Sequence, residues 1–392
     1  MISRSPSTAG SAVSAHDWAE HLNWMEGCPS SEPAKKTEKK KAWPGMLVVL
    51  VIAACGYWIS SRATATGASY GGFTDPVLLS MVAGVLAGNL IRDGRFLAGA
   101  GWASRTILPA GIVLLGARMD FFEALKIGLP GLALSVVVVG MSIALMLVIG
   151  GRLGVEPRLS CLLGVGTGIC GGTAIVAIAP LLKTKERDVM IGVGLVTLAG
   201  LVAMLILPAL ALTLGFSSVQ FGMLAGLTIQ QTPQAIAAGF AFGEEAGHIA
   251  TVAKLTRVCL LAPVAAVIAW VITSESGGEA KTGVGGNWFR FLPKFALGFL
   301  LLAAVRSLGL IPEIGLTWGN LIGGDPRAVV FDTTNILKWT ASFFLCVGMA
   351  GVGYQTRFSQ LSGFGWRPIV AMVATILLMT VAVAVSARLL FQ

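Results

Sequence analysis

The chain has 392 residues, a mean hydropathy of +0.81 and only 12% charged residues. Soluble globular domains carry about 25% charged residues, so this composition excludes a soluble fold. The net charge of +9 would favour nucleic acid as a partner of a soluble protein. Here most basic residues lie between apolar runs, where they set membrane topology or attract an anionic solute, so no nucleic-acid partner is expected.

Residues 1–42 are rich in Ser, Ala, Pro and Lys and predict a disordered N-terminal tail. The tail ends in Lys-Thr-Glu-Lys-Lys-Lys directly before the first apolar run. Such a basic cluster marks the cytoplasmic side of a membrane, which places the N-terminus in the cytoplasm. The first apolar run begins too late for an ordinary secretory signal peptide, and residues 43–392 are expected to form one transmembrane transporter domain.

About eleven apolar runs approach the roughly 20 residues that a membrane-spanning helix needs. They are residues 43–60, 75–91, 102–117, 129–150, 159–182, 189–214, 219–242, 249–273, 291–310, 336–354 and 368–390. The pattern predicts an all-α fold, a polytopic transmembrane bundle of about 10 to 11 spans. Whether 159–182 crosses the membrane or is re-entrant stays open, and the side of the C-terminus depends on it.

Residues 163–175 read Leu-Gly-Val-Gly-Thr-Gly-Ile-Cys-Gly-Gly-Thr-Ala-Ile and contain five glycines. Because each glycine costs a helix up to about 1 kcal/mol, a discontinuous helix is expected near residues 164–173. Backbone opened at membrane depth must line a polar cavity or be buried in protein, and free N–H groups at a helix start favour an anion. Close helix packing through small residues is the alternative. The candidate substrate-binding residues here are Gly168, Cys170, Gly171, Gly172 and Thr173.

Residues 226–239 form a second interrupted run, with three glutamines and a proline in its middle. Pro233 suits the first turn of a helix that has Thr232 as its N-cap, so a break is expected near residues 228–234. The alternative is a proline kink whose glutamines bond neighbouring helices. The polar candidates for substrate binding at this break are Gln230, Gln231, Thr232 and Gln234.

Two basic residues, Lys254 and Arg257, lie three positions apart inside an apolar run and therefore share one helix face. They are candidates for attracting or holding an anion; the alternative is that both side chains extend to the membrane interface. No apolar run contains the paired acidic residues expected of a strong cation or proton relay.

Enzyme signatures such as a Walker loop, HExxH, DDxxD or GxSxG are absent from the sequence. His16, His21 and His248 are not clustered, and the six cysteines form no CxxC pair. We therefore expect no catalytic site, no metal and no cofactor.

The segment Gly-Ile-Cys-Gly-Gly-Thr-Ala-Ile-Val-Ala at 168–177, followed by Pro-Leu-Leu-Lys-Thr-Lys-Glu at 180–186, resembles the signature of the YeiH-type family, labelled as sulfate exporters. Residues 109–118, 253–263 and 349–356 resemble the same family, and the likeness runs from about residue 43 to the C-terminus. It implies a multi-pass protein of the bacterial inner membrane, distantly related to transporters with two inverted five-helix repeats and crossed broken helices.

One departure from that family concerns Gln230 and Gln231, where a histidine followed by an acid is common. Neither glutamine titrates near neutral pH, which argues against proton coupling through this site or points to a different substrate. A weak internal repeat pairs residues 111–116 with 348–353. At that offset the partner of the glycine-rich break would fall beyond Gln392, so either the halves differ in length or the match is accidental.

These patterns favour a secondary carrier that exports or exchanges a small anion of the sulfate or sulfonate class. A channel or a cation-coupled carrier is the main alternative, because carbonyl groups at a helix break can bind Na⁺. A structural membrane subunit is a third hypothesis, although it would leave the two polar breaks without a purpose. The expected partners are a small anionic solute and the lipid bilayer, and a homodimer is left open.

Overall fold

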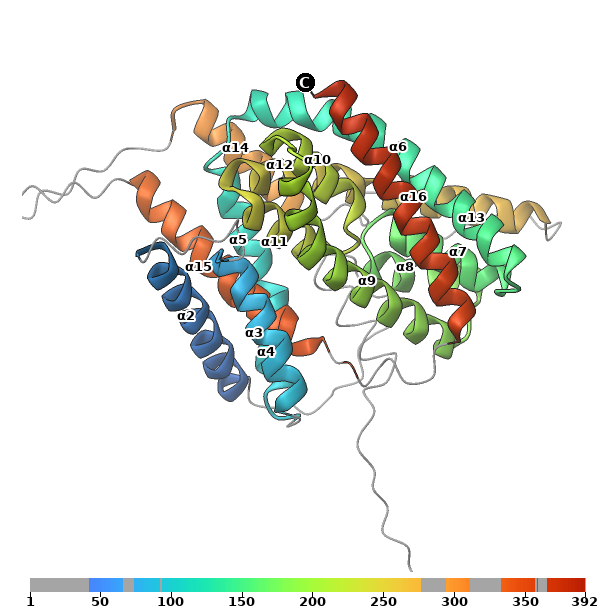
Figure 1. Cartoon of the computed structure of the whole chain (residues 1–392), viewed down its shortest axis with the longest axis horizontal. Coiled ribbons are helices and arrows are strands. Elements are labelled where there is room, and N and C mark those ends of the chain that lie inside the picture. Colours follow the sequence, from blue (N-terminus) through green and yellow to red (C-terminus); the bar gives the residue numbers. More distant parts are fainter. Residues whose placement is uncertain are drawn as a thin grey trace, which may run out of the picture.

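The computed structural model describes residues 42–65, 74–91, 94–275, 294–310, 333–356, 358 and 365–391. Within these ranges every regular element is a helix, and the helices form one bundle (Figure 1). The all-α polytopic fold is therefore confirmed. The predicted tail at residues 1–42 lies outside the described ranges, apart from Ala42.

Each of the apolar runs predicted from the sequence contains at least one helix. The elements are α2 (Trp43–Ala65), α3 (Pro76–Leu90), α4 (Leu97–Trp102), the π-helical turn η1 (Ala103–Ile107), α5 (Leu108–Gly116), α6 (Phe121–Arg152), α7 (Pro157–Gly168), α8 (Gly172–Leu182), α9 (Glu186–Thr213), α10 (Ser218–Thr228), α11 (Thr232–Phe242), α12 (Glu244–Cys259), α13 (Leu261–Glu275), α14 (Lys294–Ser307), α15 (Thr333–Gln355) and α16 (Trp366–Leu390).

Among the described residues, 7 helical segments are long and apolar enough to cross a membrane. They are Trp43–Ala63, Leu97–Gly116, Phe121–Arg152, Glu186–Thr213, Glu244–Ile272, Ile336–Gln355 and Trp366–Leu390. Several helices begin at side chains that bind free backbone N–H groups. Asp75 accepts from Val77 and Leu78 at the start of α3, and Asp120 caps α6 in the same way.

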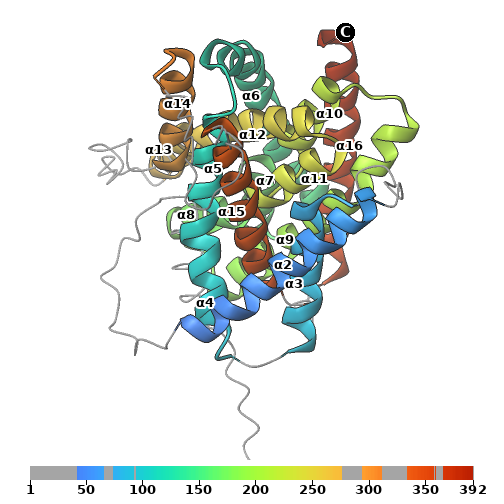
Figure 2. The ribbon, with the colours of Figure 1, turned by 90° about the vertical axis from the view of Figure 1, so that its left-hand side faces the viewer.

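One side of the bundle is built from α2, α3, α4, α5, α14 and α15, which Figure 2 shows facing the viewer. Glycines allow these helices to approach closely. A Cβ added to Gly111 of α5 would lie 3.1 Å from Cβ of Phe344 on α15, and one added to Gly348 would meet Leu108. The two helices that contain the motifs of the predicted repeat therefore pack against each other, and a common origin for the motifs stays a prediction.

The other side of the bundle is framed by the long helices α6, α9 and α16. The beginning of α16 lies at the link between α6 and α7, where the Arg367 side chain is next to Gly154. Its end lies at the link between α9 and α10, where Gln220 Nε2 donates to the carbonyl of Phe391 over 3.1 Å. A 25-residue helix is about 37 Å long, so these two links lie on opposite sides of the bundle (Figure 1).

Candidate functional site

The first interrupted segment, α7 and α8, is a helical hairpin. At its base, Arg158 Nη1 donates to the carbonyl of Lys183 over 3.4 Å, joining the start of α7 to the end of α8. Nearer the tip, the Ile175 side chain fills the space where Gly166 would carry a Cβ. The break predicted near 164–173 is confirmed at residues 169–171. The segment 159–182 therefore folds back on itself, which favours the re-entrant alternative that the sequence left open.

The second interrupted segment, α10 and α11, is also a hairpin. The rings of Phe221 and Phe242 stack at its base with centroids 4.4 Å apart, and Gly222 and Gly239 both face Ala246 of α12. The segment 219–242 thus returns to the side from which it starts, although its length alone suggested a single span.

The break near 228–234 is confirmed at residues 229–231, where the backbone is extended. One detail of the prediction is wrong, because Gln231 and not Thr232 is the N-cap of α11. Thr232 is instead the first helical residue, which places Pro233 at a position where its missing N–H has no cost.

The tips of the two hairpins meet inside the bundle. The first hairpin starts from the α6–α7 link and the second from the α9–α10 link, at opposite ends of α16. A Cβ added to Gly171 would lie 2.8 Å from Gln231 Cγ. Gly171 has φ +75° and ψ −128°, a conformation that favours glycine. Two opposed hairpins thus bring breaks 60 residues apart in the chain into contact.

Lys254 and Arg257 of α12 are fully buried at the junction of the hairpins. Lys254 Nζ donates to the carbonyl oxygens of Ile169, Ile229 and Gln230, over 3.1, 2.7 and 2.5 Å. Arg257 donates to the carbonyl oxygens of Thr167, Gly168 and Leu227. The alternative that these side chains extend to the membrane interface is wrong, because both end inside the protein.

All six accepting carbonyls lie at the C-terminal ends of α7 and α10 or in the breaks that follow. These ends carry partial negative charge, which the two cations offset. The N-terminal ends of α8 and α11 begin at the same junction, and the first N–H groups of a helix have no acceptor within it. The junction therefore contains two full positive charges and two positive helix ends.

Asp75 is the most deeply buried carboxyl group among the described residues, and it caps the start of α3 by accepting from the N–H groups of Val77 and Leu78. The six hydrogen bonds given above for Lys254 and Arg257 all end on neutral carbonyl oxygens. Charges taken out of water need a partner, so the junction favours an anion.

The glutamines of the second break bond to α9 and to their own hairpin. Gln231 Nε2 donates to Thr197 Oγ1 over 2.6 Å, and Gln234 Nε2 donates to the Thr197 carbonyl over 2.9 Å. The side-chain oxygens of Gln230 and Gln234 are buried without a hydrogen-bond partner. They lie beside Gly200, so they are available to bind a donor such as a bound water or a solute hydroxyl.

Thr197 was not predicted from the sequence, where its only signal is a hydroxyl in the middle of a long apolar run. Thr173 was predicted, but its Oγ1 points back to the carbonyl and Sγ of Cys170, over 3.3 and 3.2 Å. The structure brings all the sequence-predicted site residues to the hairpin junction; their binding of a substrate stays a prediction. They are Gly168, Cys170, Gly171, Gly172, Thr173, Gln230, Gln231, Thr232, Gln234, Lys254 and Arg257.

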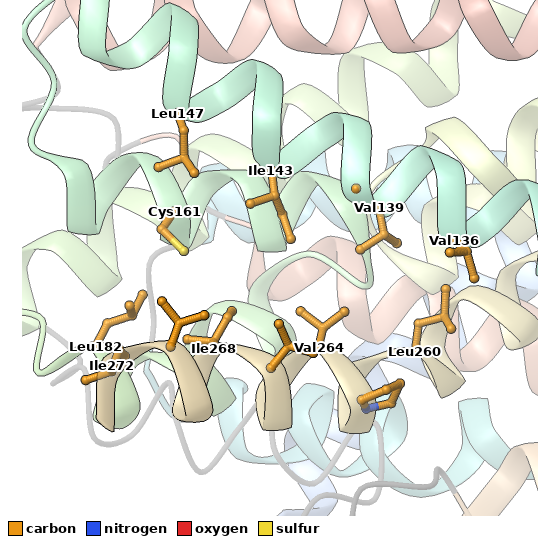
Figure 3. Close-up of a pocket in the computed structure, with 14 residues that line it drawn as sticks. Val136, Val139, Ile143, Leu147, Cys161, Leu182, Leu260, Val264, Ile268 and Ile272 are labelled. Carbon is orange, nitrogen blue, oxygen red and sulfur yellow. The ribbon is translucent and has the colours of Figure 1, made fainter. Parts of the chain in front are cut away.

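A separate cavity of about 560 Å³ lies between α6 and α13, with Cys161 and Leu182 from the first hairpin at the end near Leu147 and Ile272 (Figure 3). Its other lining residues are apolar and include Val136, Ile143 and Val264. A charged solute would lose its hydration there without gaining hydrogen-bond donors. This cavity is therefore not suited to bind an anion.

Comparison with known proteins places the chain in a family. The family model described as Conserved hypothetical protein 698 matches residues 44–372. The chain is 31% identical over 353 residues to the UPF0324 membrane protein TauZ of Paracoccus denitrificans, which covers 89% of this chain and 96% of that protein. The chain belongs to the UPF0324 membrane protein family.

Other UPF0324 membrane proteins are similar to the chain at about the same level of identity. One from Bradyrhizobium diazoefficiens is 30% identical over 341 residues, 86% of this chain and 90% of that protein. One from Bacillus cereus is 32% identical over 276 residues, which cover 70% of this chain and 75% of that protein. No solved structure matches the chain. Membership confirms the resemblance seen in the sequence and a multi-pass membrane location, and the matched range contains both hairpins.

Proposed function

We propose that this UPF0324 protein is a secondary carrier that exports or exchanges a small anion across the bacterial inner membrane. The observation that carries the proposal is the junction of two opposed hairpins around fully buried Lys254 and Arg257, whose six described hydrogen bonds end on neutral carbonyl oxygens. An anion between the tips would balance positive charge that neutral carbonyl oxygens do not cancel. Transporters commonly place substrate sites at broken helices near the middle of the membrane.

The donors at the junction suit a compact oxyanion. The N-terminal ends of α8 and α11 offer backbone N–H groups and the positive ends of two helix dipoles. Gly171 and Gly172 have no side chain to prevent a close approach to this backbone. A sulfate or a small organosulfonate presents several acceptor oxygens to such donors, and this is the substrate class that the sequence resemblance suggests.

The same proposal includes a cytoplasmic N-terminus, no enzymatic reaction, and the solute and the bilayer as partners. A cation-coupled carrier is the second candidate, because carbonyl oxygens at helix breaks are ligands that transporters use for Na⁺. In this structure such carbonyls surround Lys254 Nζ.

The test is counterflow of radiolabelled sulfate into proteoliposomes that contain the purified protein. Unlabelled sulfite, thiosulfate, taurine and chloride serve as competitors, and protein-free liposomes are the control. We expect saturable exchange of sulfate or of one of the competing anions. If no anion exchanges at all and uptake depends only on a cation gradient, the anion carrier is wrong and the second candidate stands.

A further inference from the structure

The carbonyl oxygens around Lys254 come from both hairpins. Ile169 belongs to the break of the first hairpin, and Ile229 and Gln230 belong to the break of the second. A carbonyl group without a donor is costly at membrane depth. The three donors of one ammonium group match these three acceptors.

This arrangement has the chemistry of a monovalent cation site. Carbonyl oxygens from unwound helix segments are the ligands with which broken-helix transporters bind a coupling ion. Lysine carries a compact point charge on a flexible stem, whereas arginine presents a planar fork. The Lys254 ammonium therefore resembles a bound ion, while Arg257 spreads its bonds over Thr167, Gly168 and Leu227 one turn further along α12.

We propose that the Lys254 ammonium replaces a bound coupling cation at the carbonyl oxygens of Ile169, Ile229 and Gln230. The charge that joins the two hairpin tips is then a permanent part of the chain. Binding of the tips to each other needs no Na⁺, and anion exchange runs without a Na⁺ gradient. The transport consequence rests on the proposed function, but the cation site itself does not.

The site can be tested without any transport by removing the resident cation. Lys254→Ala leaves three carbonyl oxygens facing an empty space as large as the lost side chain. The purified protein is heated in detergent in the chloride salts of sodium, ammonium, methylammonium and N-methylglucamine, and its Tm is measured. We expect the wild-type Tm to be equal in all four salts. The Lys254→Ala Tm should fall by about 5 °C or more in N-methylglucamine and recover in ammonium, methylammonium or sodium.

Lys185→Ala is the matched control, because Lys185 is exposed at the start of α9 and its loss should leave the Tm and its salt response unchanged. A Lys254→Ala protein that is folded and equally stable in all four salts would overturn the proposal, as would a wild-type Tm that rises specifically with sodium. If Lys254→Ala cannot be purified, Lys254→Gln takes its place. The neutral amide still donates to carbonyls, so its Tm should be lowered in every salt alike; a wild-type Tm for this variant contradicts the need for a charge.

A transport measurement then separates this inference from the proposed function. Anion exchange by the wild type should proceed at the same rate with and without sodium, and that of Lys254→Ala should increase about tenfold or more when a small cation is added. Cation rescue of the Tm without any anion flux would refute the anion carrier and leave the cation site standing. Anion flux in the wild type that requires sodium would support the anion carrier and refute the proposed role of the Lys254 ammonium.

Discussion

At the scale of single residues, the hairpin junction depends both on glycine, which has no side chain, and on the buried side chains of Lys254 and Arg257. Gly171 adopts a positive φ at the first tip, directly against Gln231 of the second tip. The sequence predicted a break in the helix of this segment, because the five glycines are a local signal. It did not predict the bonding of Lys254 and Arg257 to carbonyl oxygens, since their acceptors lie 24 to 90 positions away along the chain.

Replacing Gly171 by alanine should abolish anion exchange or reduce it more than tenfold. The new Cβ would lie 2.8 Å from Gln231 Cγ at a φ of +75°, and such strain costs on the order of 1 to 3 kcal/mol. Gly151→Ala is the control, because nothing lies within 4 Å of a Cβ at that position. The measurement is sulfate counterflow at equal protein content. Unchanged exchange by Gly171→Ala would mean that the contact between the hairpin tips is not needed for transport.

Gln231→Glu should weaken anion binding about tenfold or more at neutral pH. A carboxylate at the junction repels an anion a few ångströms away by about 2 kcal/mol or more at an effective dielectric constant near 20. Because a protonated glutamic acid is neutral, the defect should shrink as the pH falls toward about 4 to 5. Apparent affinities from competition at several pH values check this.

Gln220→Glu is the matched control for that change. Gln220 lies at the base of the same hairpin, where its Oε1 accepts from the Ser217 N–H over 3.1 Å. A carboxylate keeps that bond but loses the donation of Nε2 to the Phe391 carbonyl. Both bonds lie at the base of the hairpin, so the Tm should fall while affinity and its pH dependence stay close to those of the wild type. Equal effects of the two substitutions would mean that Gln231 has no special position relative to the anion.

At the scale of elements, each interrupted helix is a hairpin whose two arms contact each other and pack even more extensively against neighbouring helices, above all α6 and α12. Phe221 is fully buried in the base of the second hairpin and stacks on Phe242. α12 packs along both arms of this hairpin and supplies the two cations at its tip. We therefore expect the base to contribute to stability and the tip to contribute to the proposed binding of an anion.

Phe221→Ala should destabilise the protein by about 3 kcal/mol without changing the selectivity among anions. The loss should appear as a Tm lowered by roughly 6 °C or more. Phe343→Ala is the control, because this ring on α15 is 43% exposed and its removal leaves little cavity. A Phe221→Ala protein with wild-type Tm but altered selectivity would place the base of the hairpin in the binding site.

At the scale of the whole molecule, the two hairpins start from opposite ends of α16 and meet between them. The C-terminal end of α16 lies at the base of the second hairpin, through the bonds of Gln220 to Phe391 and of Arg388 to Leu214. The C-terminus is therefore on the side from which the second hairpin enters.

Labelling of single cysteines with a membrane-impermeant maleimide tests this topology in intact and in opened vesicles. In a background without the native cysteines, Glu156→Cys and Lys185→Cys should react from one side, since both lie at the base of the first hairpin. Ser217→Cys and Glu245→Cys should react from the other side. Labelling of positions 156 and 185 from opposite sides would mean that α7 and α8 together cross the membrane.

The sequence by itself determined the membrane location, the helical runs and the positions of both breaks. These are local properties, since hydropathy, clustered glycines and Pro233 act on the segment that contains them. A run of about 24 apolar residues can cross a bilayer or fold back, and nothing within the run distinguishes the two. Only the tertiary structure decided that both broken runs are hairpins and that Lys254 and Arg257 hold their tips, because buried charges are satisfied by acceptors brought from distant parts of the chain.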